Sequence, residues 1–112
     1  MPRKTLCALI LGALLCTGYR WQYTEADALL ALQGASARVW CIARVESTYN
    51  PNALGRQGEI GLVQLHPRGL LPVFYQWGYS DPWSPWQSRA FLEQALAAGM
   101  AHHWAAVTVA GC

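Results

Sequence analysis

The sequence predicts a small domain built mainly from α-helices. Two segments begin with residues that cap helix N-termini, Thr24 with Asp27 and Ser84 with Pro85. Apolar residues after these starts recur at helical spacing, and no segment is rich in strand signals. Because the chain has only 112 residues, we expect a single domain.

Residues 1–18 are typical of an export signal. Arg3 and Lys4 make the start basic, and an uncharged, largely apolar run follows from Thr5 to Gly18. This run is shorter than the roughly 20 apolar residues of a spanning helix. We therefore favour a signal peptide cleaved near Gly18 over a retained N-terminal membrane segment.

Export places the domain, residues 19–112, in the periplasm, the cell envelope or the extracellular space, tethered to the membrane if the segment is retained. Lipidation at Cys16 is a minor alternative, because Leu15 stands where a small residue is wanted.

The charge of the exported part argues against nucleic-acid binding. Without Arg3 and Lys4, six of the eight basic residues remain, against six acidic ones. No basic stripe is left to neutralise phosphates. A nearly neutral chain with six tryptophans suits a sugar polymer better, although aromatic side chains are first of all core material.

The helices are expected in a definite order. Residues 24–34 form the first, which begins at Thr24 and stops at Gly34. Residues 35–47 form the second. Its apolar face carries Val39, Ile42 and Ala43, and the helical period adds Glu46 to that face.

The second half begins with a loop. Asn50, Pro51 and the glycines at 55, 58 and 61 predict a loop or small hairpin over residues 48–64. A short helix is expected over residues 72–77, and a long one from Pro85 toward Trp104.

Cys41 and Cys112 are the only cysteines of the exported part. An oxidising compartment permits a disulfide between them. Closing a loop of about 70 residues would stabilise the fold by roughly 4 kcal/mol. Two unpaired thiols are the alternative.

Glu46 is the candidate for acid–base chemistry. A carboxyl on an apolar helix face is costly to ionise, so burial raises its pKa and suits it to act as a general acid. The alternative is a solvated glutamate at a helix end, or one paired with Arg44 or Arg56.

The surrounding motifs carry a family resemblance. The stretch from Ile42 to Pro51 contains Glu46-Ser47 and Asn50-Pro51, and Gly61-Leu62-Val63-Gln64 follows. The stretch from Ile42 to Pro51 resembles the first signature of the transglycosylase SLT domains. The stretch from Gly61 to Gln64 resembles the second signature of the same family. Residues 35–67 match well and residues 81–104 loosely. The resemblance implies a lysozyme-like fold.

The same resemblance implies site roles. Glu46 matches the catalytic acid and base, Ser47 supports it, and Gln64 faces the substrate. The candidate substrate-binding residues are Ser47, Asn50, Gly61, Leu62 and Gln64.

The chain departs from the family at its third signature. Tyr-Asn-Ala-Gly is reduced to Val109-Ala110-Gly111, so the usual tyrosine is missing. Tyr75 and Tyr79 are candidate replacements, without support from their spacing. In its brevity the chain is also similar to the minimal domains of resuscitation-promoting factors.

The implied reaction is cleavage of peptidoglycan by a lytic transglycosylase, with one carboxylate and a 1,6-anhydro product. Glu59 and Asp81 are not expected to take part, since Glu59 lies in the glycine-rich loop and Asp81 precedes a helix that it can cap. Three alternatives remain: a lysozyme-type hydrolase such as an endolysin, an inactive peptidoglycan-binding or assembly module, and a membrane-tethered structural protein.

We expect no metal or other cofactor. His66, His102 and His103 lack ligand spacing, and no phosphate-binding loop is present. The expected partner is peptidoglycan, with transient membrane association through residues 1–18 as an option, and the protein is expected to be monomeric. The biological setting, whether phage lysis, secretion or wall remodelling, is left open.

Overall fold

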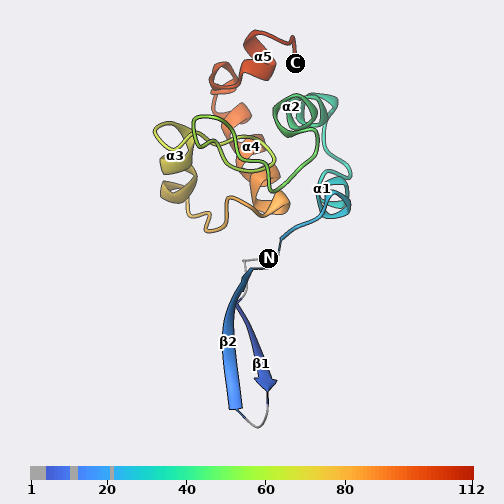
Figure 1. Cartoon of the computed structure of the whole chain (residues 1–112). Coiled ribbons are helices and arrows are strands. Elements are labelled where there is room, and N and C mark those ends of the chain that lie inside the picture. The colour runs from blue at the N-terminus through green and yellow to red at the C-terminus, as the bar shows by residue number, and fades with distance from the viewer. Residues whose placement is uncertain (1–4, 11–12, 21) are drawn as a thin grey trace.

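A computed structural model describes residues 5–10, 13–20 and 22–112 and confirms a mainly helical domain (Figure 1). The elements are, in order, β1 (Thr5–Ile10), β2 (Ala13–Arg20), α1 (Glu25–Ala31), α2 (Ala37–Ser47), α3 (Leu70–Gln76), α4 (Pro85–Ala97), the 3₁₀ helix η1 (Ala101–His103) and α5 (Ala105–Thr108).

The N-terminal region differs from expectation, because β1 and β2 pair as an antiparallel hairpin where no strands are predicted. An apolar run is compatible with a strand as well as a helix, and periodicity cannot separate them. In Figure 1 the hairpin extends away from the helices. No helix in the described part of the chain is long and apolar enough to cross a membrane. The predicted signal peptide or membrane segment at 1–18 stays a prediction, and its basic start, residues 1–4, lies outside the described residues.

Helices α1 and α2 form where their capping residues predict. Thr24 and Asp27 make a reciprocal capping box at the start of α1. The second helix starts at residue 37 rather than 35, because the side chain of Ser36 accepts a hydrogen bond from the N–H of Val39 at 3.2 Å. It ends as predicted at Ser47, before Thr48 takes a left-handed conformation.

The last predicted helix is too long. Helix α4 begins at Pro85, as expected, but ends at Ala97 instead of continuing toward Trp104. Gly99 adopts a positive φ of 78°, and the N–H of Met100 reaches back to the carbonyl of Ala95 at 3.0 Å. This is a glycine-based helix stop. The chain then turns through η1 into α5.

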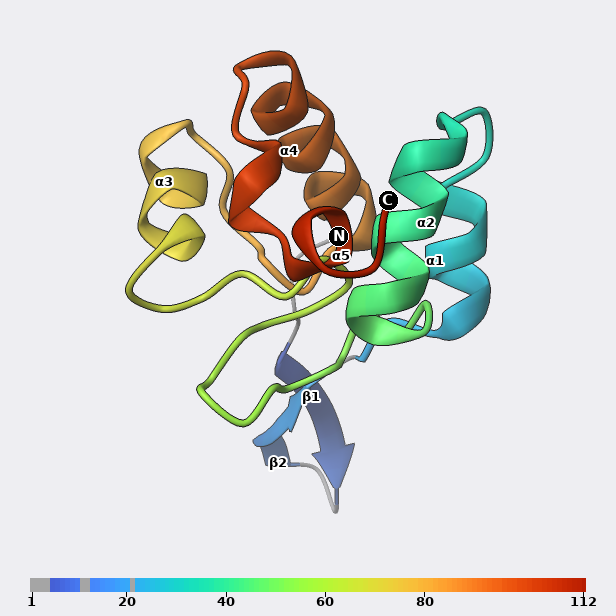
Figure 2. The same cartoon turned by 90° about the horizontal axis from the view of Figure 1, so that it is seen from above.

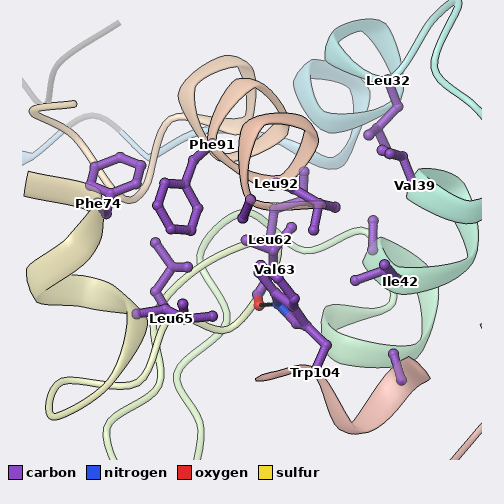
Figure 3. Close-up of a cluster of buried hydrophobic side chains, with 14 of the residues drawn as sticks. Leu32, Val39, Ile42, Leu62, Val63, Leu65, Phe74, Phe91, Leu92 and Trp104 are labelled. Carbon is purple, nitrogen blue, oxygen red and sulfur yellow. Dashed lines mark hydrogen bonds between the residues drawn. The ribbon is translucent and has the colours of Figure 1, made fainter. Parts of the chain in front are cut away.

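Residues 62–65 run through the core (Figure 3). Leu62, Val63 and Leu65 have no exposed surface, although Leu62 and Val63 belong to the predicted loop. The buried Trp104 lies beside Val63 and donates its indole N–H to the Val63 carbonyl at 2.9 Å. The segment is therefore anchored by packing as well as by a buried hydrogen bond.

Helix α5 lies beside α2 (Figure 2). Cys112, just after α5, forms a disulfide with Cys41 of α2, with Cα atoms 5.8 Å apart, as the sequence predicts. The N–H of Cys112 also donates to the carbonyl of Ala106 at 2.9 Å. The disulfide thus ties the C-terminal segment to the helix that carries Glu46.

Candidate active site

Glu46 lies in the last turn of α2, on the apolar face that the spacing predicts. Val39, Ile42 and Ala43 on that face are buried, and Glu46 is half-buried. Its Oε2 atom accepts a hydrogen bond from the backbone N–H of Ala106 at 3.1 Å. Two segments 60 residues apart therefore meet at this carboxyl.

The pKa of Glu46 is raised above its ordinary value of 4.5, chiefly because partial burial disfavours the charged form. The N–H of Ala106 acts in the opposite direction, and the negative charge of Glu59 raises the pKa further. Within residues 22–112, Glu46 forms no salt bridge with Arg44 or Arg56. A larger protonated share at neutral pH is what a general acid needs.

Ser47 joins the end of α2 to the second motif. Its hydroxyl lies 2.7 Å from the Leu62 carbonyl and 3.0 Å from the Ala43 carbonyl, so its single proton is available to both acceptors. This contact fixes the distance between α2 and residues 61–64. The hydroxyl faces backbone, and its substrate contact stays a prediction.

The side chain of Gln64 is hydrogen-bonded to the backbone of the surrounding loop. Its Nε2 atom donates to the carbonyls of Gly61 at 3.0 Å and Ala53 at 3.3 Å, and its backbone has a positive φ of 54°. The side-chain amide group therefore keeps the loop closed after Glu46. Whether its oxygen also binds sugar stays a prediction.

Position 61 requires a glycine because the backbone of Pro82 lies too close to leave room for a side chain. Its φ is 81°, and a Cβ there would stand 2.5 Å from the carbonyl oxygen of Pro82. Leu62, the next residue, is completely buried. In this structure Gly61 and Leu62 position the loop. Their predicted contact with substrate stays a prediction.

Replacing Gly61 with alanine should destabilise the fold more than the same change at Gly34. Both glycines have positive φ, but a Cβ at Gly34 would meet nothing within 4 Å. The unfavourable backbone costs about 1–2 kcal/mol at either site, and overpacking adds about 1–3 kcal/mol at Gly61 alone. Urea unfolding of the two variants measures the difference. Equal losses would show that the Pro82 contact has no energetic effect.

Asn50 and Asn52 shape the loop after α2. The exposed Asn50 accepts a hydrogen bond from the N–H of Asn52 at 2.9 Å through its side chain, which is a local turn. The Asn52 side chain donates to the carbonyl of Tyr23. Asn50 thus has a structural contact, and its predicted substrate contact stays a prediction.

Asp81 and Glu59, the other acidic residues considered for the site, have different surroundings. Asp81 is buried and accepts hydrogen bonds from the Tyr23 hydroxyl at 2.8 Å and the Trp83 N–H at 3.0 Å. The cap of α4 is Ser84, so Asp81 secures the turn before that helix. Glu59, by contrast, acts on Glu46 through its charge.

Tyr79 and Tyr75, the candidate replacements for the missing tyrosine, differ in their surroundings. Tyr79 packs against Phe74 and Phe91 and donates its hydroxyl to Gln94, so its contacts are those of a packing residue. Tyr75 is 49% exposed. The group that reaches Glu46 from this end of the chain is the backbone N–H of Ala106. Sequence reasoning misses it, because a backbone donor leaves no residue-specific signal.

Comparison with known proteins identifies the family. A scan against protein-family descriptions matched residues 27–91 to the transglycosylase SLT domain. This range covers more than half of the chain and contains Glu46, Ser47 and the Gly61–Gln64 motif. Comparisons with curated proteins and with solved structures found no match. The chain belongs to the transglycosylase SLT domain family, whose activity is lysozyme-like and directed at peptidoglycan.

Proposed function

We propose that this protein cleaves peptidoglycan strands at the β-1,4 bond between N-acetylmuramic acid and N-acetylglucosamine as a lytic transglycosylase, with Glu46 as its one catalytic acid and base. The observation that supports this most is the setting of Glu46. In a member of this family, the motif carboxyl is half-buried, has a raised pKa and is unpaired with any cation of residues 22–112.

In the first step, Glu46 gives its proton to the glycosidic oxygen. The bond from that oxygen to the anomeric carbon breaks, and the acetamido oxygen of the same sugar bonds to the anomeric carbon in its place. Glu46 is left as a carboxylate. The N–H of Ala106 then stabilises the negative charge, because hydrogen bonds to an ionised acceptor are stronger.

In the second step, the Glu46 carboxylate takes the proton of the sugar's own C6 hydroxyl. The C6 oxygen bonds to the anomeric carbon, the acetamido oxygen leaves, and a 1,6-anhydro end results. Glu46 recovers its proton. Hydrolysis, the alternative outcome, differs only in that water replaces the C6 hydroxyl, as in a lysozyme-type endolysin.

The product therefore tests the proposal. Purified peptidoglycan is digested with the exported protein, and the fragments are weighed by mass spectrometry. We expect 1,6-anhydro ends, which are about 18 Da lighter than hydrolysed ends because no water is added. Reducing ends would assign the hydrolase, and an absence of fragments would assign the inactive binding module.

Export is part of the same proposal, because peptidoglycan lies outside the cytoplasm. Residues 1–18 supply the basic and apolar order of a signal peptide. The mass of the exported product reports cleavage near Gly18. A product of full length would favour a membrane tether.

A further inference from the structure

Two arginines in the connection between α2 and α3, residues 48–69, have no acidic partner. Arg56 and Arg68 are exposed, and neither forms a salt bridge within residues 22–112. Glu59 is the only acidic residue of this connection. It is only partly exposed, and its Oε1 atom is buried. The two exposed charged residues of the connection are therefore both positive.

Hydrogen bonds hold the backbone next to these arginines in a fixed arrangement. The ring of His66 accepts a hydrogen bond from the N–H of Arg68 at 3.0 Å. The other ring nitrogen is hydrogen-bonded to the side-chain oxygen of Gln57 at 3.2 Å, and Gln57 directly follows Arg56 in the sequence. The two arginines are therefore attached to neighbouring stretches of backbone, although they are 12 residues apart in the sequence.

This arginine pair belongs to the loop that contains the second family motif. Arg56 follows Gly55, where a Cβ would stand 2.7 Å from the side-chain oxygen of Gln64, the last motif residue. The same motif is joined to the end of α2 by the hydrogen bond from the Ser47 hydroxyl to the Leu62 carbonyl at 2.7 Å. In Figure 2 the connection runs along the edge of the helical domain. Groups attached to a glycan strand at the site can therefore contact this loop.

The proposed substrate carries groups that match the charge of the arginine pair. In peptidoglycan, short stem peptides are attached to the lactyl groups of N-acetylmuramic acid, and these peptides carry free carboxylates. The sugar units themselves are uncharged once the lactyl carboxyl is bound to a peptide. Arginine binds a carboxylate with two parallel hydrogen bonds. A contact through arginine therefore recognises the stem peptide rather than the sugar.

We propose that Arg56 and Arg68 bind the carboxylates of the stem peptides and make the enzyme prefer glycan strands that carry peptides over bare strands. Because this role takes peptidoglycan as the substrate, it rests on the proposed function. No chemical step needs either arginine, so the two are specificity-determining residues. The stem is covalently attached to the strand that the site holds, and a contact that is weak by itself then adds to the affinity for the whole substrate.

The test is a calorimetric binding titration in a Glu46→Gln background, which prevents cleavage during the measurement. Three preparations of soluble, uncross-linked strands are compared: strands with stem peptides, strands whose stem carboxyls have been converted to amides, and strands from which an amidase has removed the peptides. Protein with both arginines should bind the first preparation about three- to tenfold more tightly than the other two, because each exposed arginine–carboxylate pair contributes up to about fivefold.

The variants show which arginines cause this preference. Arg56→Gln combined with Arg68→Gln removes both charges and should bind all three preparations alike. The matched control is Arg38→Gln, because Arg38 is also exposed and forms no salt bridge within residues 22–112, but lies at the start of α2. This control should keep the preference for strands with free stem carboxyls.

Cleavage with Glu46 intact gives a second readout. The double variant should raise KM for peptide-bearing strands about three- to tenfold and leave kcat unchanged, because the contact is made equally before and during the reaction. The proposal is overturned if the preference persists in the double variant, or if Arg38→Gln loses it as well. A persisting preference with lost binding to phosphatidylglycerol vesicles would assign the arginines to a membrane surface instead. A wild-type protein that binds strands without cleaving them would overturn the proposed function, and the binding titration would still decide the role of the arginines.

Discussion

Glu46→Gln is expected to lower peptidoglycan cleavage by about a hundred- to ten-thousandfold, the usual contribution of a positioned acid–base group. Glutamine keeps the shape of the side chain and can still accept the N–H of Ala106. It has no proton to give to the glycosidic oxygen and cannot take one from the C6 hydroxyl. The rate at which a peptidoglycan suspension clears measures the loss.

The control for this variant is Glu93→Gln, which makes the same chemical change on the exposed surface of α4 and should keep wild-type activity. The wild-type enzyme should also lose activity as the pH rises through the raised pKa of Glu46, because only the protonated form is an acid. Wild-type clearing by Glu46→Gln would exclude Glu46 as the catalytic group.

Replacing both Cys41 and Cys112 with serine should lower the free energy of unfolding by about 4 kcal/mol. The disulfide joins residues 71 positions apart, and a closed loop of this length restricts the unfolded chain strongly. Urea unfolding of the folded variant and the wild type measures the effect.

This double variant should also lose activity under conditions in which it remains folded. The C-terminal segment carries the N–H of Ala106, which contacts Glu46, and the disulfide attaches that segment to α2. Releasing it loosens the hydrogen bond at the carboxyl. Full activity in a folded but destabilised variant would show that the segment stays in place without the bond.

Local signals predict most of the helices. Thr24 and Asp27 close a capping box around neighbouring backbone, and Ser84 with Pro85 starts α4; both need only adjacent residues. The predicted end of α4 is wrong because apolar periodicity continues past Gly99, the residue that stops the helix. The pairing of β1 with β2 is missed because an apolar run fits either a strand or a helix.

Some features of the candidate site can be predicted from the sequence, and others cannot. Helical spacing places Glu46 on the apolar face of α2. The count of cysteines favours a bond between Cys41 and Cys112 over two unpaired thiols, and the structure contains that bond. The hydrogen bond that Ala106 donates to Glu46 depends on tertiary packing. Ala106 acts through backbone 60 residues away from Glu46. The carboxyl group of Glu59 lies close to Gly55, where a Cβ would stand 2.2 Å from its Oε2 atom, and the position of Glu59 in a glycine-rich loop does not reveal this.

The most direct test of a raised pKa at Glu46 is the ¹³C NMR titration of its carboxyl carbon in the disulfide-bonded wild-type protein. We expect the midpoint to lie above the ordinary glutamate value of 4.5, because burial and the charge of Glu59 outweigh the hydrogen bond from Ala106. A midpoint at or below 4.5 would mean that the carboxyl is solvated and ionised like any surface glutamate, and would contradict its assignment as the acid.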